Sequence, residues 1–305
     1  MEGGSMFRRA ERKKAKLRLA LCGPSGAGKT YSALLIAQGL GGRIAVVDTE
    51  HGSGELYAHL YEYDVAPLIP PFTPTRYIQL ISEAEKEGYD VVIIDSLSHA
   101  WSGEGGVLDM KDAVTRASKS GNSFAAWREV SPEHNRLVEK LLSADLHLIV
   151  TMRTKTAWEV VHEDGKAKPV KVGLAPVQRE GLEYEFTVVF DLSVDGHIAT
   201  ATKDRTSMFD GKSFLPMRKT GQELLAWLQT GVDPVIPLDM SEKTLEGLLE
   251  RISMVETIWD LKNLWYKHVG EVNRLLPEHK QIVVDAKNER KNELDGGRRD
   301  VRAID

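Results

Sequence analysis

The sequence predicts an α/β protein with a mainly parallel sheet, and two patterns carry that prediction. Several short runs consist almost entirely of apolar residues, as strands do when helices cover both faces of a parallel sheet. Segments with helical periodicity separate these runs, which is the alternation that parallel connections require. The predicted strands of this kind are residues 17–22, 44–48, 90–95 and 146–150.

Helices are predicted in the segments that separate these strands. The first follows a glycine-rich segment and places four apolar residues on or near one face, namely Leu34, Leu35, Ala37 and Leu40. The second helix spans 75–87. The third is amphipathic and spans 124–143, with Pro132 in it or near its start.

The pattern changes after residue 150. Residues 156–172 alternate between polar and apolar types around Glu163-Asp164-Gly165-Lys166, which indicates a hairpin. Two further strands are predicted over 184–192 and 197–203. A turn at Asp195-Gly196 joins them, so we expect an antiparallel pair at one edge of the sheet.

Four segments divide the chain: a flexible basic tail (1–16), the α/β core (17–230), a linker (231–240) and a small helical module (241–305). Glycine and proline between 231 and 237 indicate the linker. The module is predicted from apolar residues at helical spacing, which are Leu245, Leu248, Leu249, Ile252 and Val255, followed by Leu261, Leu264, Trp265 and Val269.

Composition excludes several classes of protein. The net charge of −5 gives no overall signal for nucleic-acid binding, so such a surface would have to be a local patch. The single cysteine, Cys22, excludes an internal disulfide framework. No run approaches the ~20 apolar residues of a membrane span. Residues 1–18 are too basic for a signal peptide. We therefore expect a soluble, cytoplasmic protein without a membrane partner.

A phosphate-binding motif follows the first strand. The eight residues Gly23, Pro24, Ser25, Gly26, Ala27, Gly28, Lys29 and Thr30 match G-x-x-x-x-G-K-[ST], and Tyr31 adjoins them. Glycines let successive backbone N–H groups point at phosphate oxygens, and the helix N-terminus adds partial positive charge. Lys29 would reach the β- and γ-phosphates and Thr30 would ligate Mg²⁺. The sequence thus predicts binding of a nucleoside triphosphate.

Carboxylates at the ends of two strands are candidates for the chemistry. Asp95 ends an apolar strand, where a carboxylate holds the Mg²⁺ that Thr30 ligates. Glu50 lies just beyond the strand 44–48, where it could orient the attacking water. Asp48 is its rival in the same stretch, and position alone leaves the choice open.

Two groups of cations are further candidates. Lys203 and Arg205 end the last strand on one side, so together they could reach the transferring phosphoryl group. Six cations near Trp158 would suit single-stranded nucleic acid, because phosphates meet cations while bases stack on aromatic rings. These six are Arg153, Lys155, Lys166, Lys168, Lys171 and Arg179. A solvated hairpin explains their charge equally well.

In this order the motifs resemble the RecA/RadA family of recombinase ATPases, most closely its phage-encoded members that anneal or recombine single strands. Val46-Val47-Asp48-Thr49-Glu50-His51 is similar to the family's second-strand motif, which implies that Glu50 rather than Asp48 activates water. Val92-Ile93-Ile94-Asp95-Ser96 resembles its Walker B motif. Met152-Arg153-Thr154-Lys155 and Gly181-Leu182-Glu183-Tyr184 resemble the two ends of its second DNA-binding loop.

The resemblance also implies assembly. Lys203-Asp204-Arg205 is similar to the Lys-x-Arg element that RadA proteins insert into the neighbouring subunit's ATP. Phe7-Arg8-Arg9-Ala10 is similar to the Phe-x-x-Ala motif that joins RadA-type protomers, with Phe7 and Ala10 as contacts. One departure is Thr151, which lies near the place of the glutamine that couples ATP to DNA in RecA.

The resemblance implies a RecA-like P-loop NTPase core that binds ATP and Mg²⁺ and forms a homo-oligomer, as a ring or a filament. The implied function is annealing or strand exchange on single-stranded DNA, with a single-strand-binding protein as a further partner. Two alternatives stay open: a ring-forming motor of the helicase type, and a nucleotide-switched interaction protein with little turnover.

Overall fold

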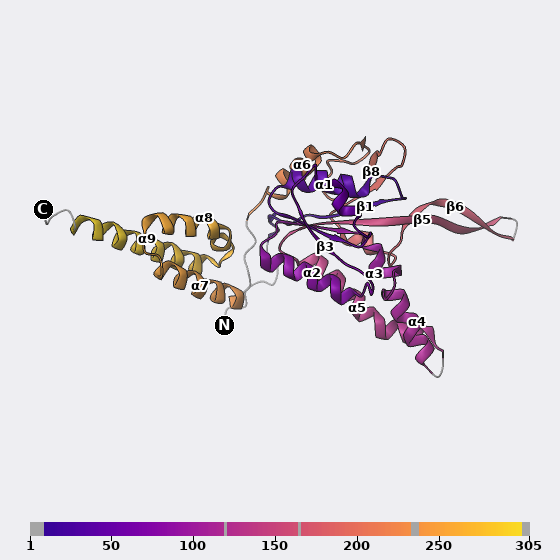
Figure 1. The fold of residues 1–305 in the computed structure, drawn as a ribbon, viewed down its shortest axis with the longest axis horizontal. Coiled ribbons are helices and arrows are strands. Elements are labelled where there is room, and N and C mark those ends of the chain that lie inside the picture. Colours follow the sequence, from indigo (N-terminus) through magenta and orange to yellow (C-terminus); the bar gives the residue numbers. More distant parts are fainter. Residues whose placement is uncertain (1–8, 119–120, 164–165, 233–237, 301–305) are drawn as a thin grey trace. The chain divides into compact units, whose positions relative to one another are not determined.

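A sheet of nine strands forms the centre of the fold (Figure 1). The computed structural model describes residues 9–118, 121–163, 166–232 and 238–300, with the backbone alone described at 157–163, 166–172 and 296–300. The chain divides into two compact units, Lys16–Gln229 and Met1–Ala15 with Thr230–Asp305. The sheet belongs to the first unit, and the order of its main path is β3-β2-β4-β5-β1-β7-β8-β9.

The strands from β3 to β7 along this path are parallel, as the apolar runs predict. They are β1 (Arg18–Gly23), β2 (Ile44–Asp48), β3 (Asp64–Pro67), β4 (Val91–Asp95), β5 (His147–Glu163) and β7 (Val188–Leu192). Two antiparallel strands, β8 (Ala199–Asp204) and β9 (Ser213–Phe214), complete the edge next to β7. The mixed α/β class with a mainly parallel sheet is therefore confirmed.

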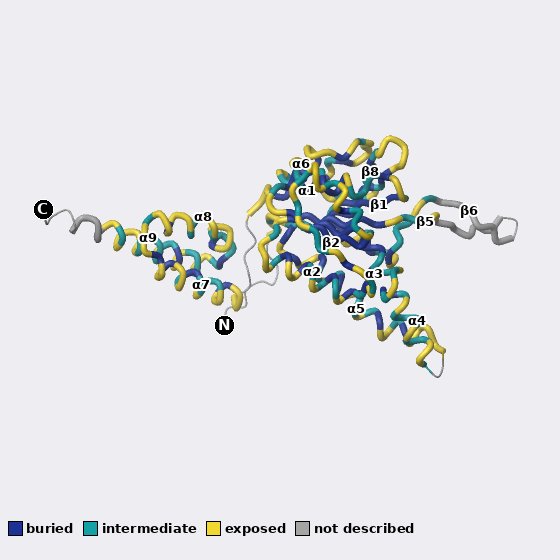
Figure 2. Tube along the Cα trace, in the orientation of Figure 1, coloured by how far each residue is buried: buried dark blue, intermediate teal, exposed yellow. Residues whose placement is uncertain are grey.

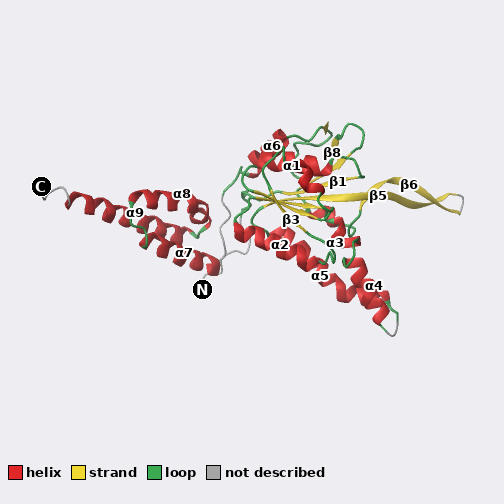
Figure 3. Ribbon diagram, viewed as in Figure 1, coloured by secondary structure: helices red, strands yellow, loops and turns green. Residues whose placement is uncertain are grey.

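Helices cover both faces of the sheet (Figure 3). On one face lie α1 (Lys29–Leu40) and α6 (Arg218–Leu228), which pack on residues such as Leu19 and Phe190. On the other face lie α2 (Pro74–Glu87) and α5 (Ser123–Ser143), packed around Tyr77 and Leu137. The short helices α3 (Ser98–Ser102) and α4 (Val107–Ala117) connect β4 to α5. Figure 2 shows the buried strands between these layers.

Helices α1 and α6 approach each other through glycine. A Cβ atom at Gly39 would lie 2.0 Å from the carbonyl oxygen of Arg218, and one at Gly221 would lie 2.1 Å from that of Ile36. No other residue type fits at such distances, because real Cβ atoms do not approach backbone oxygens this closely. The two helices are consequently in direct backbone contact.

Strand β5 continues far beyond the sheet. Its residues up to Arg153 pair with β1, whereas those from Thr154 to Glu163 pair with β6 (Lys166–Pro176) in an antiparallel hairpin. Figure 1 shows this hairpin extending away from the rest of its unit. The predicted hairpin is confirmed, but the predicted strand end at residue 150 is wrong, since sheet strand and hairpin strand are one continuous element.

Two predicted strand boundaries need correction. The strand predicted to begin at residue 184 begins at Val188, because Leu182–Glu185 form a 3₁₀ turn after Gly181, whose φ is 90°. The next strand begins at Ala199 rather than at residue 197, since His197 has a left-handed φ of 53°. The expected antiparallel pairing of these two strands, β7 and β8, is confirmed.

The helical module contains α7 (Leu238–Ser253), α8 (Ile258–Arg274) and α9 (Pro277–Asp300). Its buried side chains include Leu248, Ile252 and Leu261, in agreement with the predicted apolar positions, whereas Val269 is 38% exposed. In the same unit, the backbone of Lys13 forms an isolated parallel β-bridge with that of Val232. Half of the predicted linker, residues 233–237, lies outside the described residues. None of the helices in the described part of the chain combines the length and apolar composition needed to cross a bilayer.

Candidate active site

The phosphate loop joins β1 to α1, and Gly28 precedes the helix in a left-handed conformation with φ 82°. This conformation favours glycine, and a Cβ atom there would also come within 3.2 Å of the His197 ring. The ammonium group of Lys29 donates to the carbonyl oxygens of Gly23 (3.0 Å) and Pro24 (2.8 Å). Burial lowers the pKa of Lys29. A phosphate is the natural replacement for these two neutral acceptors, because a charged partner binds an ammonium more strongly.

Asp95 ends β4 and accepts hydrogen bonds from two hydroxyl groups. Thr30 Oγ1 donates to one carboxylate oxygen at 2.6 Å, and Thr151 Oγ1 donates to the other. Asp95 is only 2% exposed, and this burial raises its pKa. A hydroxyl and a carboxylate in contact are oxygen donors of the kind that Mg²⁺ prefers, so Thr30 and Asp95 fit this ion.

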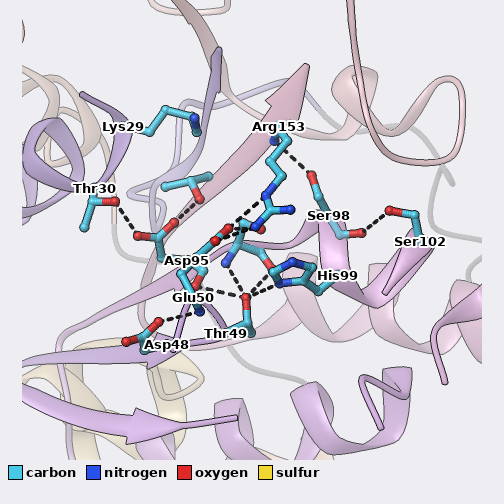
Figure 4. Close-up of polar contacts among 12 residues, drawn as sticks. Lys29, Thr30, Asp48, Thr49, Glu50, Asp95, Ser98, His99, Ser102 and Arg153 are labelled. Carbon is cyan, nitrogen blue, oxygen red and sulfur yellow. Dashed lines mark hydrogen bonds and ion pairs between the residues drawn. The ribbon is translucent and has the colours of Figure 1, made fainter. Parts of the chain in front are cut away.

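The geometry distinguishes Glu50 from Asp48 (Figure 4). Both carboxylate oxygens of Asp48 accept backbone N–H groups, from Glu50 at 2.6 Å and Gly54 at 3.2 Å, so Asp48 holds the turn after β2 in place. The Glu50 side chain instead lines the cavity that contains Lys29 and Asp95. Of the two rivals, Glu50 is thus the carboxylate positioned to act on a bound nucleotide.

Arg153 is the principal partner of Glu50. Its Nε donates to Glu50 Oε1 at 3.0 Å and its Nη2 donates to Oε2, so the guanidinium holds both carboxylate oxygens. Ser96 Oγ donates to Oε1 as well, at 3.2 Å. Burial acts to raise the pKa of Glu50, but the hydrogen bonds and charge of Arg153 outweigh it, and the net shift is downward.

A second group of polar side chains fixes the loop that carries Glu50. Thr49 Oγ1 accepts the Ser96 N–H at 2.7 Å and lies 2.6 Å from His99 Nδ1. The ring of His99 stacks on Phe72, with 4.8 Å between centroids. Burial lowers the pKa of His99. Through these contacts Thr49, the residue before Glu50, connects the end of β2 to the end of β4 and to α3.

A cavity of about 1170 Å³ connects the candidate residues. Its lining includes three charged side chains at or after strand ends and at the start of α1, those of Lys29, Glu50 and Asp95. It also includes apolar and aromatic side chains, namely Tyr31, Leu35, Tyr57, Leu215 and Met217. The rings of Tyr31 and Tyr57 lie 5.6 Å apart. Charged groups suit the phosphates of a nucleotide, and aromatic rings suit its base.

Lys203 and Arg205 lie at the end of β8 and do not line this cavity. Both side chains donate to the same carbonyl oxygen, that of Tyr184, with Arg205 Nη2 at 3.2 Å. Burial, and the charge of Arg205 next to it, lower the pKa of Lys203. The structure therefore brings these two cations together, as their spacing predicts, but away from the phosphate loop of their own chain.

The cations predicted to bind nucleic acid fall in several places. Arg153 and Lys155 lie at the base of the hairpin, and Arg179 follows it, where its Nη1 donates to Asn135 Oδ1 at 3.0 Å. The backbone of Lys166, Lys168 and Lys171 lies in β6, and their side chains are outside the described residues. Phe7 is also outside them, while Ala10 is exposed.

Sequence reasoning missed the contact between Arg153 and Glu50, and the contribution of residues 215–218 to the cavity. The sequence contained a signal for the contact between Arg153 and Glu50. Glu50, Asp95 and Arg153 all follow segments predicted as parallel strands, and the carboxyl ends of such strands meet at one edge of the sheet. The contribution of residues 215–218 had no such signal, since these residues lie in an irregular segment before α6.

A comparison with known families identifies the domain that contains this site. The model of the AAA domain family matches residues 15–220, which include every strand of the sheet and the whole cavity. No curated protein matches the chain. With a phosphate loop, a buried carboxylate on β4 and a family match over two thirds of its length, the chain belongs to the AAA domain family of nucleotide-binding P-loop ATPases.

Proposed function

We propose that this chain is a Mg²⁺-dependent ATPase of the RecA/RadA type, which assembles on single-stranded DNA and promotes annealing or strand exchange in phage recombination. The observation that supports hydrolysis is the cavity itself, in which Lys29, Asp95 and Glu50 converge from three different elements. A single-strand-binding protein is the further partner that we propose.

Each residue has a role in this reaction. The backbone N–H groups of 23–30 surround the phosphates, and Lys29 exchanges its two loop carbonyls for phosphate oxygens. Thr30 and Asp95 would hold Mg²⁺, which neutralises charge on the phosphates when it is bound. Glu50 orients a water molecule toward the γ-phosphate and accepts its proton, and the terminal P–O bond to the leaving ADP breaks.

Lys203 and Arg205 would complete the site of a neighbouring subunit. Their absence from the cavity of their own chain, and their shared contact with one carbonyl, support a role in trans. Positive charge supplied by a neighbour stabilises the transferring phosphoryl group and makes hydrolysis depend on assembly. The hairpin of β5 and β6 would present its lysines to the DNA backbone.

The test is a measurement of ATP hydrolysis with and without single-stranded and duplex DNA, while light scattering follows the assembly state. We expect single-stranded DNA to raise the hydrolysis rate and the assembly mass together. Lys29→Ala should lower hydrolysis by at least about 100-fold, the size of loss typical when a preorganised charge contact is removed. Full activity of Lys29→Ala would contradict the proposed site.

Two other results would replace this function with its alternatives. Steady hydrolysis coupled to duplex unwinding would identify a helicase-type motor. Weak hydrolysis that no DNA stimulates would identify a nucleotide-switched interaction protein. If neither the unaltered protein nor Lys29→Ala anneals strands, the recombination role is wrong, but the assignment of the chain as an ATPase is unaffected.

A further inference from the structure

His197 lies in the turn between β7 and β8 and has a backbone conformation that few side chains adopt. Its φ is 53°, in the left-handed region, directly after Gly196 with φ 66°. The Ser193 N–H donates to the Ile198 carbonyl oxygen at 2.9 Å and closes the turn around it. A residue other than glycine is strained in this region, and backbone strain is concentrated at functional sites. The strain at His197 therefore calls for a functional reason.

The turn brings the His197 ring to the phosphate loop. Strand β7 pairs in parallel with β1, so the turn after β7 and the loop after β1 lie at the same edge of the sheet. The ring Nδ1 lies 3.2 Å from the point where a Cβ atom of Gly28 would stand. His197 also lines the cavity together with Lys29. The strained backbone thus places an imidazole beside the loop that is suited to phosphates.

The imidazole of His197 has hydrogen-bonding capacity that the described part of the chain does not use. A neutral imidazole has one N–H donor and one acceptor nitrogen. Neither nitrogen has a hydrogen-bond or ion-pair partner among the described residues, and the side chain is exposed. A ligand in the cavity is consequently able to accept a hydrogen bond from the ring without displacing an existing contact.

The order of the strands indicates which part of a nucleotide lies next to His197. On one side of β1 lie β5, β4 and β2, with Asp95 at the end of β4 and Glu50 just beyond β2. On the opposite side of β1 lies β7. The Mg²⁺ ligand and the base for water act at the terminal phosphates, so the γ-phosphate lies toward β4 and β2. The α-phosphate then lies toward β7 and His197.

We propose that His197 binds the α-phosphate of the nucleotide, through a hydrogen bond from its ring N–H to a phosphate oxygen. ATP and ADP share this phosphate, so the contact binds substrate and product equally and does not favour the transition state. His197 is accordingly a binding residue, and the backbone strain brings its ring to the loop. This inference rests on the nucleotide site of the proposed function, but it requires neither DNA nor assembly.

The experiment measures the binding of ADP in the presence of Mg²⁺ by isothermal titration calorimetry, for the unaltered protein, His197→Ala and His197→Gly. Both variants lose the ring. We therefore expect Kd for ADP to rise at least about 10-fold in each, the lower end for a hydrogen bond to a charged group. In steady-state hydrolysis, KM for ATP should rise by a similar factor while kcat stays unchanged.

Melting temperatures of the nucleotide-free proteins distinguish ligand binding from a structural role of the ring. Alanine keeps the left-handed strain and glycine relieves it, so His197→Gly should melt at a higher temperature than His197→Ala. If the ring only packs on the loop, both variants should melt below the unaltered protein and bind ADP unchanged. Ser207→Gly is the matched control, because Ser207 also has a left-handed φ, of 59°, but does not line the cavity. It should keep full affinity for ADP.

Unchanged affinity for ADP in both His197 variants would overturn the inference. A larger loss for ATP than for ADP would also overturn it, since the ring would then act at the γ-phosphate. A loss that disappears when 2′-deoxy-ADP replaces ADP would assign the ring to the ribose instead.

The proposed function has its own control in these titrations. If the unaltered protein binds no ADP, or if Lys29→Ala binds it equally well, the nucleotide site itself is wrong. If Lys29→Ala loses binding and the His197 variants keep it, only the role of His197 is wrong.

Discussion

Asp95 is placed to bind a metal ion, but without that ion its buried negative charge is unfavourable. Its carboxylate is almost fully buried and has hydroxyl donors but no cation in contact with it among the described residues. Burying an ionised carboxylate without a cation is unfavourable. The residue is therefore suited to a bound metal at the expense of the stability of the free protein.

Asp95→Asn should for this reason stabilise the nucleotide-free protein and abolish hydrolysis. The amide is neutral, so one of the two hydroxyls (Thr30 or Thr151) can keep donating to its carbonyl oxygen while the other rotates to accept an amide N–H. We expect the melting temperature at pH 7 to rise by about 2–4 °C, equivalent to ~1 kcal/mol for a domain of this size.

The effect of pH follows from the direction of the shift. Because the folded-state pKa of Asp95 is raised above its unfolded value, the folded protein gains stability as the pH falls through that folded pKa. The difference in melting temperature between Asp95→Asn and the unaltered protein should shrink over the same range. Asp112→Asn is the control and should melt as the unaltered protein, because this half-exposed carboxylate pairs with Lys111 at the surface, where an ion pair contributes little. A lower melting temperature for Asp95→Asn would contradict the cost assigned to the buried charge.

At the scale of elements, the outer part of the hairpin of β5 and β6 is separate from the sheet of its unit. Beyond Thr154 and Pro176 its strands pair with each other. Changes in its outer residues should consequently alter binding without altering the stability of the sheet.

Replacing Lys166, Lys168 and Lys171 with glutamate tests this separation. Affinity for single-stranded DNA should fall, and the slope of log K against log salt should decrease by about 2, given ~0.7 per phosphate contact on a single strand. Fluorescence anisotropy over a salt series measures both. The same reversal at Lys86, Lys212 and Lys219, exposed lysines of the core, is the matched control. Unchanged affinity in the hairpin variant would show that the DNA site lies elsewhere.

Local patterns allowed the sequence to predict some elements and not others. The apolar runs at β1, β2 and β4 and the loop ending in Thr30 carry their own signals, and all appear where expected. The start of β7 was misplaced because Tyr184 and Phe186 have high strand propensity, while the preceding Gly181 imposes a turn. Here the backbone conformation of one residue outweighed the propensity of its neighbours.

The candidate site was predictable where a motif defines it and not where contacts are distant. Lys29, Thr30 and Asp95 follow from motif and order. The contact of Arg153 with Glu50 joins residues 103 positions apart. The predicted parallel strands place both residues at one edge of the sheet, but the contact itself depends on the register of β2, β4 and β5, which no local pattern contains. For the same reason, Arg153 was assigned from its charge to the predicted nucleic-acid cluster alone.

At the scale of the whole molecule, the proposed active site is shared between subunits. Lys29→Ala retains the cations at 203 and 205, and Arg205→Ala retains an intact phosphate loop. Arg205→Ala alone should bind ATP normally but hydrolyse it at least about 100-fold more slowly. In a mixture of the two variants, some interfaces combine an intact loop with an intact arginine, so hydrolysis should partly recover.

The hydrolysis rate of the equimolar mixture, compared with the mean of the two separate variants, measures this recovery. The control is a mixture of Lys29→Ala with the double variant Lys29→Ala/Arg205→Ala. It should show no recovery, because neither protein has an intact phosphate loop. A mixture no more active than the mean would place the arginine in its own subunit's reaction or outside the reaction.

The backbone contact between Gly39 of α1 and Gly221 of α6 restricts movement of the helices that contribute to the cavity. Lys29 begins α1 and Arg218 begins α6, and both line the cavity. Because Gly39 and Gly221 are in backbone contact, α1 and α6 have little room to move relative to each other. We therefore expect movement during the proposed reaction to occur at Glu50 and Arg153, and a methyl group added at Gly39 to force α1 and α6 apart.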